Sequence, residues 1–279
     1  MASPNLQAYY SKANCENQLF SAGDLIRICE DFGFIFAFFL GKMLKNEQSG
    51  GESVRYGQIR RGVFLERPNR FVAYAEIADG VQKVHVKNTG RCRELLIPGT
   101  VIWLDESDNP QRKTRYDLVA VEKGNKLINM DSQAPNRVFG EFVAAGKFMP
   151  GLTSVKAEAT WGDSRLDFRL EDADGPIFVE VKGVTLEADG HARFPDAPTE
   201  RGVKHLRGLK RAVEQGYRAA VVFVIQMEDV KSLAPNDDTH PAFGEALREA
   251  AAAGVGVYAY SCRVIPGEVE ILRPVPVIL

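Results

Sequence analysis

Two carboxylates and a lysine are spaced so that two neighbouring strands would bring them together. In residues 177–182, the alternation of side chains along a strand turns Glu180 and Lys182 away from the apolar face. On the predicted strand before it, the same alternation turns Asp167 away from its apolar neighbours. Because only a short, turn-forming segment separates the two strands, they form a hairpin that gathers Asp167, Glu180 and Lys182 on one polar face.

This group has the composition of a metal-dependent phosphodiesterase site. Asp167 and Glu180 supply oxygen ligands for Mg²⁺ or Mn²⁺, and a backbone carbonyl near Val181 supplies a further one. Such an ion polarises a phosphodiester and lowers the pKa of a bound water, while Lys182 stabilises the charge that develops or orients the water. The spacing, Asp-x12-Glu-x-Lys, resembles the core pattern of the restriction-endonuclease-like nucleases. The alternative is an ordinary Glu–Lys pair on the solvent side of a hairpin, worth about 0–1 kcal/mol.

A helix predicted over residues 199–216 would place positive charge beside these carboxylates. Its apolar residues recur at steps of three and four, and basic residues, including Arg201 and Lys204, recur at the same steps on another face. That face could hold phosphates near the carboxylates, or it could be an ordinary solvated face. We interpret His205, on the same helix, as a hydrogen-bonded structural histidine rather than a general base.

The elements before this site predict a small β-barrel in residues 55–125. Short strands alternate there with turns at regular spacing, which is typical of an OB-type barrel, whose face binds single strands or phosphate backbones. Residues 54–115 hold 12 Lys and Arg against 7 Asp and Glu, whereas the rest of the chain holds 23 against 30. This asymmetry favours a polyanion-binding module, although an arginine-rich solvated surface would have the same composition.

Residues 130–279 predict an α/β domain, so that the chain as a whole is of the mixed α/β class. The apolar run at 219–225 indicates a strand buried on both faces of a sheet, and the helices around it would cover that sheet. The predicted order is a helix at 136–147, strands at 154–160, 165–170 and 177–182, the helix at 199–216, the strand at 219–225, a helix at 241–253 and a strand at 256–261.

Composition excludes several classes of protein. With 279 residues, 45% of them hydrophobic and 26% charged, the chain has the composition of a soluble globular protein with one large or two small domains. No apolar run approaches the roughly 18 residues of a membrane span, so no membrane partner is expected. The 4 cysteines are widely separated and form no C-x-x-C pair, which favours reduced thiols in the cytoplasm over a zinc cluster.

Residues 1–54 differ from the rest and are interpreted as an N-terminal extension of unknown role. They contain an aromatic patch at 32–40 and end in a linker-like segment at 48–53. A second hypothesis is that translation begins at Met43 and that the residues before it are an artefact. The mass of the native protein would distinguish the two.

Four motifs, in order along the chain, resemble the sugar fermentation stimulation protein family (SfsA). They are residues 87–92 (KNTGRC), 164–168 (SRLDF), 180–186 (EVKGVTL) and 194–206 (FPDAPTERGVKHL). The resemblance extends from Arg55 to the end of the chain and supports a translation start near Val54. It implies an OB-like N-terminal barrel, a restriction-endonuclease-like C-terminal domain, non-specific DNA binding and a role in regulating sugar (maltose) metabolism.

The resemblance also implies further site residues. It adds Glu200 and Lys204, from the helix that follows, to the carboxylate cluster as catalytic candidates. It marks the loop of Asn88, Thr89 and Arg91 as functional, where a nest of backbone amides for phosphate and a plain β-turn are both open. Because the family's name describes a phenotype, it does not decide between a nuclease and a regulator.

Two functions follow from these observations. In the first, the protein is a Mg²⁺- or Mn²⁺-dependent DNA phosphodiesterase; in the second, it is a DNA-binding regulator whose nuclease fold is vestigial. Both predict salt-sensitive DNA binding, and a structural or protein-binding module is a third, less favoured class. The residues predicted to contact nucleic acid are Arg60, Arg61, Arg67, Arg70, Asn88, Thr89, Arg91 and Arg201.

Overall fold

The computed structural model describes residues 53–279, apart from 89 and 163, and the expectations for residues 1–52 therefore lie outside the described part. The described residues belong to one unit, and three helices are described in it among a larger number of strands. None of the described helices is long and apolar enough to cross a membrane.

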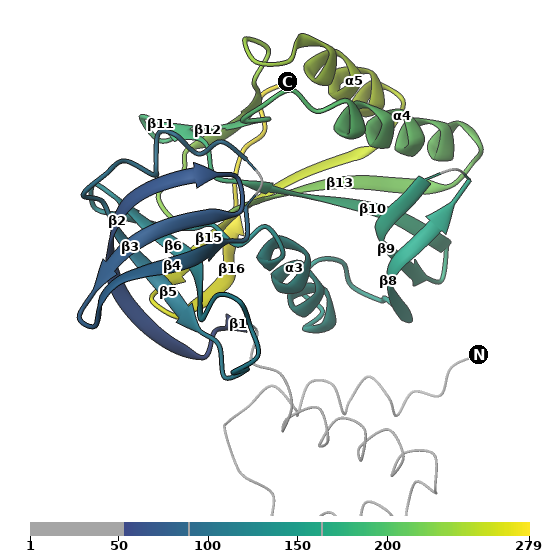
Figure 1. Ribbon diagram of the computed structural model, residues 1–279. Helices are drawn as coiled ribbons and strands as arrows, with labels where there is room; N and C mark the ends of the chain where they lie inside the picture. Colours follow the sequence, from purple (N-terminus) through teal and green to yellow (C-terminus); the bar gives the residue numbers. More distant parts are fainter. Residues whose placement is uncertain (1–52, 89, 163) are drawn as a thin grey trace, which may run out of the picture. The chain divides into compact units, whose positions relative to one another are not determined.

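The first part of this unit is a closed β-barrel, as predicted (Figure 1). Its strands are β2 (Gln58–Asn69), β3 (Val72–Ile77), β4 (Gly80–Val86), β5 (Val101–Glu106), β6 (Tyr116–Lys123) and β7 (Lys126–Asn129). They hydrogen-bond in the order β4-β3-β2-β5-β6-β7, and parallel pairing between β4 and β6 closes the sheet on itself. Phe64, Ile102 and Leu118 are among the buried side chains that fill the interior.

The second part is a seven-stranded mixed sheet covered by helices on both faces (Figure 1). In spatial order its strands are β1 (Val54–Arg55), β16 (Glu268–Pro274), β15 (Gly256–Ile265), β13 (Arg218–Ile225), β10 (Gly175–Val184), β9 (Ser164–Asp172) and β8 (Ser154–Trp161). Helix α3 (Ala134–Ala144) lies on one face, and helices α4 (Glu200–Glu214) and α5 (Pro241–Ala252) lie on the other.

The central strand β13 is buried on both faces, as its continuous apolar run predicts. Val221 packs into the hydrophobic cluster that includes α4 and α5, whereas Val222 packs into the cluster that includes α3. The same alternation in β10 sends Phe178 to the α4 side. Glu180, two residues further along, therefore belongs to the α4 side as well.

Several short strands escaped prediction. A three-stranded sheet of β11 (Glu187–Ala188), β12 (His191–Phe194) and β14 (Ser232–Pro235) lies beside the main sheet, and β7 extends the barrel. Strands of two to four residues are too short to carry an alternation pattern. The longer β16 alternates at its start, where Val269 and Ile271 each follow a glutamate, and it follows a turn at Gly267 that the prediction overlooked.

Buried polar contacts fix the barrel against the sheet. The backbone N–H of Asn129 donates to the Gln226 carbonyl at 2.9 Å, and Gln226 Nε2 donates to Asn129 Oδ1 at 2.8 Å. The fully buried carboxylate of Asp131 accepts hydrogen bonds from Lys87 Nζ at 2.8 Å and from the Tyr56 hydroxyl at 3.3 Å. Because a buried charge is tolerated only when it is paired, this network holds the barrel in one position relative to the sheet.

Candidate active site

Asp167 lies where the ladders on both sides of β9 are broken. On the β8 side, the residue level with it is Glu158, whose left-handed φ of 57° interrupts an otherwise regular ladder. On the β10 side, regular pairing ends at Phe168 and Val179, and Asp167 Oδ2 instead accepts the backbone N–H of Val181 at 2.8 Å. A carboxylate is thereby fixed at the point where the strands separate.

The prediction that the apolar residues of β9 share one face is wrong around Asp167. Leu166 packs into the core cluster of α4, whereas Phe168 packs into the core cluster of α3. Between them, Asp167 Oδ1 accepts a hydrogen bond from Asn136 Nδ2 of α3 at 2.8 Å. The physical reason is the broken ladder, because simple alternation assumes an uninterrupted strand.

Glu180 is buried beneath α4 and is only 3% exposed, which excludes a solvent-exposed Glu–Lys pair. Two donors converge on one of its oxygens: Lys182 Nζ lies 2.5 Å from Oε1, and His205 Nδ1 contacts the same atom. The other oxygen, Oε2, is buried and has no hydrogen-bond partner among the described residues. Since a buried polar atom without a partner is costly, the arrangement leaves one oxygen for a further ligand.

The two carboxylates respond differently to burial. Burial raises the pKa of Asp167, and the nearby charge of Glu180 raises it further, against the hydrogen bonds that Asp167 accepts. Burial also opposes ionisation of Glu180, but the hydrogen bond from His205 and the charge of Lys182 outweigh it and lower the pKa of this carboxyl. A cation between the two would relieve their repulsion.

His205 belongs to the site, which the sequence interpretation did not foresee. Its hydrogen bond confirms the expectation of a hydrogen-bonded histidine, but the partner is Glu180. The buried stripe of α4 includes Gly202, His205 and Leu209, so the histidine occupies a core position of the helix. A polar side chain on an apolar stripe was the signal that it needs a buried partner.

The residues that the resemblance added on α4 lie at its exposed side. Thr199 caps the helix by accepting the Gly202 N–H at 3.0 Å, and the helix begins at Glu200. The Glu200 side chain is 88% exposed and pairs with His240 Nε2 at 3.1 Å instead of joining Asp167 and Glu180. Lys204 is exposed on the same helix.

Asp167 and Glu180 supply carboxylate oxygens, whose chemistry is suited to a divalent cation. With residues 1–52, 89 and 163 left aside, no group of three or more His, Cys, Asp or Glu side chains gathers where it could hold a metal ion. The fit therefore depends on Asp167 and on the bare Oε2 of Glu180. Carboxylate oxygens are the ligands of hard cations such as Mg²⁺, Mn²⁺ and Ca²⁺, which complete their coordination with carbonyls and water.

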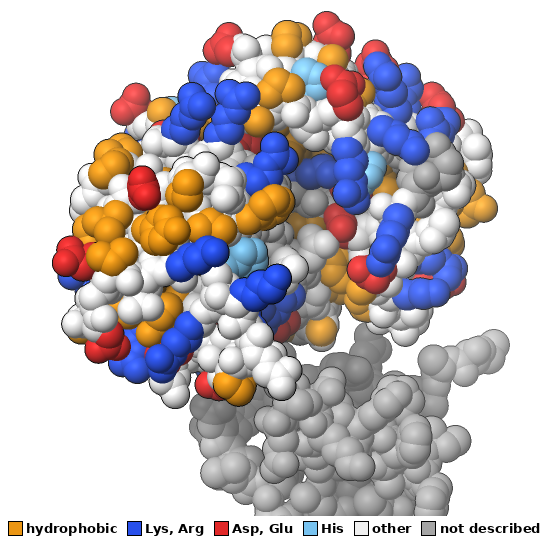
Figure 2. Space-filling view, viewed as in Figure 1, with side chains coloured by type: hydrophobic (Ala, Val, Ile, Leu, Met, Phe, Trp, Pro, Cys, Tyr) orange, Lys and Arg blue, Asp and Glu red, His pale blue; other side chains and the backbone are white. Residues whose placement is uncertain are grey.

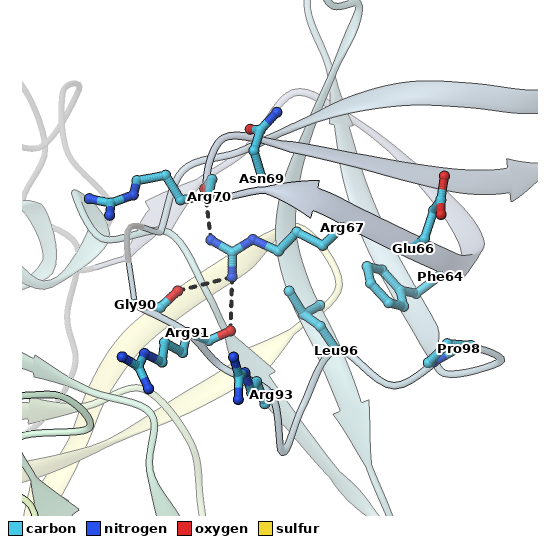
Figure 3. A pocket seen from close by; sticks show the side chains of 10 residues that line it. All are labelled: Phe64, Glu66, Arg67, Asn69, Arg70, Gly90, Arg91, Arg93, Leu96 and Pro98. Carbon is cyan, nitrogen blue, oxygen red and sulfur yellow. Dashed lines mark hydrogen bonds between the residues drawn. The ribbon is translucent and has the colours of Figure 1, made fainter.

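Arg67 has another role than the predicted contact with nucleic acid. Its terminal nitrogens donate to the backbone carbonyls of Arg70 at 2.7 Å, Gly90 at 2.9 Å and Arg91 at 3.0 Å (Figure 3). A fourth bond goes to the carbonyl of Asn88 at 2.7 Å. These bonds engage all four terminal N–H groups of the guanidinium. Arg67 therefore braces the loop that follows β4 and has no terminal donor left for a phosphate.

The braced loop also touches the segment that leads into α4. Asn88 Oδ1 accepts the Gly90 N–H at 2.8 Å, which tightens the turn, while Thr89 lies outside the described residues. A Cβ atom at Gly90 would come within 2.5 Å of Asp196 Oδ2, so a larger residue here would require the Asp196 side chain to move. The barrel loop thus lies against the chain just before the helix that carries His205.

Three arginines around this loop present unpaired positive charge. Arg70, Arg91 and Arg93 line an open pocket of about 440 Å³, and none of their side chains forms an ion pair with a residue that the structure describes. Phe64 and Leu96 belong to the apolar part of the same pocket (Figure 3). Because like charges held together repel, this arginine pocket is suited to an anion. Prediction from the sequence missed Arg93.

The other predicted basic residues divide into engaged and available ones. Arg60 Nε pairs with Glu106 Oε2 at 2.8 Å, so its charge is already neutralised. Arg61, the next residue on β2, is exposed and forms no ion pair with a described residue. Arg201 is exposed on α4, but its Nε donates to His205 Nε2 at 3.3 Å.

Basic side chains gather around a hollow between the barrel and the helix-covered sheet. Figure 2 shows Lys and Arg side chains (blue) on both sides of this hollow, with fewer acidic ones between them. The surface therefore offers a positively charged track that could take a phosphate backbone.

The sequence matches two family models that together cover most of the described residues. One is the SfsA N-terminal OB domain, matched over residues 65–130, and the other is the sugar fermentation stimulation protein RE domain, matched over residues 133–268. These matches confirm the predicted fold class, an OB-like barrel followed by a restriction-endonuclease-like α/β domain.

Individual relatives agree over nearly their whole length. A sugar fermentation stimulation protein homolog of Ruminiclostridium cellulolyticum is 51% identical over 224 residues, covering 80% of this chain and 99% of the relative. A homolog of Desulfitobacterium hafniense (strain Y51) is 57% identical over 218 residues, covering 78% of this chain and 95% of the relative. The solved structure of Pyrococcus furiosus SfsA in complex with Ca²⁺ is similar with a TM-score of 0.75 at 30% identity, covering 81% of this chain and 98% of that one.

Proposed function

This chain belongs to the sugar fermentation stimulation protein family, and we propose that it binds DNA without sequence specificity and cleaves it with a divalent metal held by Asp167 and Glu180. The observation that carries the proposal is the Glu180 carboxylate, whose Oε1 receives both donors while the buried Oε2 stays bare. A purely structural carboxylate would distribute its donors over both oxygens. The Ca²⁺ complex of the Pyrococcus furiosus protein supports a site for a hard cation in this fold.

Each residue of the site has a distinct part in this proposal. Asp167 and Glu180 would hold Mg²⁺ or Mn²⁺, and the bound ion would polarise the phosphodiester and lower the pKa of a water molecule. Lys182, held in place through Glu180 Oε1, would stabilise the negative charge that develops on the phosphate. Asn136 keeps Asp167 in position from the α3 side.

The arginine pocket and Arg61 would hold the DNA. Their guanidinium groups match phosphate oxygens in geometry and charge, and contacts with phosphates carry no sequence information. Binding is therefore non-specific and falls with rising salt. The contact between Gly90 and Asp196 places the loop of this pocket against the segment that starts α4, so a bound strand can continue towards the carboxylates.

The biological setting is inferred from the family. Its name points to stimulation of sugar fermentation, and we infer a part in regulating sugar (maltose) metabolism. In the described residues, Cys92 and Cys262 are free and buried, which supports a reducing compartment such as the cytoplasm. The second candidate, a DNA-binding regulator without catalysis, rests only on the arginine pocket, which would serve a nuclease equally well.

A nuclease panel tests the proposal. The protein is incubated with Mg²⁺ or Mn²⁺ and single-stranded, double-stranded or branched DNA, or RNA. We expect cleavage of at least one substrate, lowered by roughly 10²-fold or more in Asp167→Ala and Glu180→Ala. Asp174→Ala removes an exposed carboxylate from the turn of the same hairpin and should cleave like the parent. No cleavage with any metal would favour the regulator instead, whereas equal turnover in Asp167→Ala would show that Asp167 does not hold the catalytic metal.

A further inference from the structure

His205 is the middle member of a chain of three polar side chains that ends at Glu180. Arg201 Nε lies 3.3 Å from His205 Nε2, and His205 Nδ1 contacts Glu180 Oε1. Arg201 and His205 are one helical turn apart on α4, and the histidine is only 7% exposed. Because a guanidinium can only donate, Nε2 accepts and the proton of a neutral imidazole lies on Nδ1, as its bond to a carboxylate requires.

The histidine therefore adds a second donor to Glu180. Lys182 Nζ approaches Oε1 from β10, and His205 Nδ1 approaches the same oxygen from α4. Together these two donors fix the carboxylate through hydrogen bonds.

We infer that His205 is a positioning residue: with its proton held on Nδ1 by Arg201, it orients Glu180 so that Oε2 faces the metal position beside Asp167. The inference rests on the proposed metal site. The terminal torsion of a glutamate is soft, so Lys182 alone could pair with either oxygen. Two donors that arrive at Oε1 from β10 and from α4 leave the carboxylate one orientation, in which Oε2 stays bare.

Metal binding in the absence of DNA tests this role without relying on turnover. The full chain is titrated calorimetrically with Ca²⁺ or Mn²⁺ at one fixed pH. In His205→Leu, which keeps much of the volume and removes the donor, we expect an affinity about 10- to 100-fold lower. His205→Asn places an amide near the position of Nδ1 and should restore most of that loss. His191→Leu, which removes a histidine bonded to Ser232, is the matched control and should bind like the parent.

The outcomes separate a positioning role from a merely structural one. A structural histidine would lower the melting temperature in EDTA when replaced, yet leave the metal affinity of the folded protein unchanged. Equal affinity of His205→Leu and the parent, or an Asn variant as weak as the Leu variant, would overturn the inference and leave the proposed function standing. A parent that binds neither ion would overturn both.

Arg201→Met tests the first link of the chain. Without the guanidinium, the imidazole proton can move to Nε2, so we expect an affinity between those of the parent and His205→Leu. The titration contains no nucleic acid, so a contact of Arg201 with DNA does not affect the result. If Arg201→Met bound the metal as tightly as the parent, Arg201 would not be what keeps the His205 proton on Nδ1.

Discussion

The arginine pocket on the barrel and the carboxylate site on the sheet both leave charge without a protein partner, but they do so at different depths. Arg70, Arg91 and Arg93 are exposed, so water solvates them while no anion is bound. Glu180 Oε2 is buried and has no such compensation. Removing the exposed arginines of the barrel should therefore change the stability of the protein little. The charged carboxylates of the sheet, by contrast, lower the free energy of unfolding because they are shielded from water.

Both regions use a residue whose own hydrogen bonds are engaged within the protein. Arg67 gives its terminal N–H groups to the carbonyls of a loop, and His205 gives its Nδ1 proton to Glu180. Beside Arg67, the exposed arginines of the pocket stay available for a ligand. Beside His205, the Oε2 atom of Glu180 does. From the sequence alone, such a residue would be assigned either to ligand binding or to the fold. Here it contributes to binding indirectly, because it holds the ligand-binding group in position.

The largest expected effect comes from removing the exposed charges together. The triple variant Arg70→Gln, Arg91→Gln and Arg93→Gln should bind duplex DNA roughly 10²- to 10³-fold more weakly near 0.1 M salt, with a log–log salt slope reduced by up to about 2.7. Its melting temperature should stay close to that of the parent, because none of the three side chains has an ion pair within the described residues.

Fluorescence anisotropy over a salt series, with Arg60→Gln as the matched control, measures this effect. Arg60 is an arginine of the same barrel that Glu106 already neutralises, so its loss should leave the salt slope unchanged. A triple variant that keeps the parent's slope would show that the DNA lies elsewhere, and the contrast between the two regions would then lose its functional meaning.

A smaller effect, of a different kind, is expected from the brace beneath the pocket. Arg67→Met keeps the apolar stem but removes the donors to four carbonyls, and we expect the free energy of unfolding to fall by about 1–3 kcal/mol. DNA affinity should fall less than in the triple variant, with the salt slope retained, because Arg67 neutralises no phosphate. Urea unfolding and the same anisotropy series decide this, and a slope reduced by about 0.9 would make Arg67 a phosphate ligand after all.

Much of the fold was predictable because its signals are local. The strands of the barrel are separated by turn residues, the apolar run of β13 indicates burial on both faces, and β10 keeps the alternation that places Glu180 and Lys182 on one side. Each of these inferences needs only a few consecutive residues. The residue types of the carboxylate site were predictable for the same reason.

What escaped prediction depends on partners that are distant in sequence. The break beside Asp167 lies opposite Glu158 on another strand, the brace formed by Arg67 needs carbonyls from a later loop, and the role of His205 needs Glu180 beneath its helix. No spacing within one segment encodes these contacts. The positions were visible as candidates, but their roles were set by packing.

The smallest expected effect has the opposite sign and tests whether the sheet bears a cost for its charges. Burial, and then the charge of Glu180, raise the folded-state pKa of Asp167 above its unfolded value. Between these two values the folded protein binds more protons than the unfolded chain, so stability falls as the pH rises through that window. Above the window the cost is fully present, and below the unfolded value near pH 4 it is absent.

Asp167→Asn removes this cost, because an amide stays neutral, can still accept the N–H of Val181, and can donate to Asn136 once the Asn136 amide turns its oxygen towards it. In EDTA at neutral pH we expect a melting temperature higher on the order of 2–4 °C, as about 1 kcal/mol gives in a domain of this size, with the gain shrinking as the pH falls towards 4. Adding Ca²⁺ should reverse the order, since a cation that binds the folded parent stabilises it and the variant has lost a ligand. A variant that melts below the parent in EDTA at neutral pH would show that Asp167 stabilises the fold. The two regions would then differ in how deeply their charges are buried, but not in what those charges cost in stability.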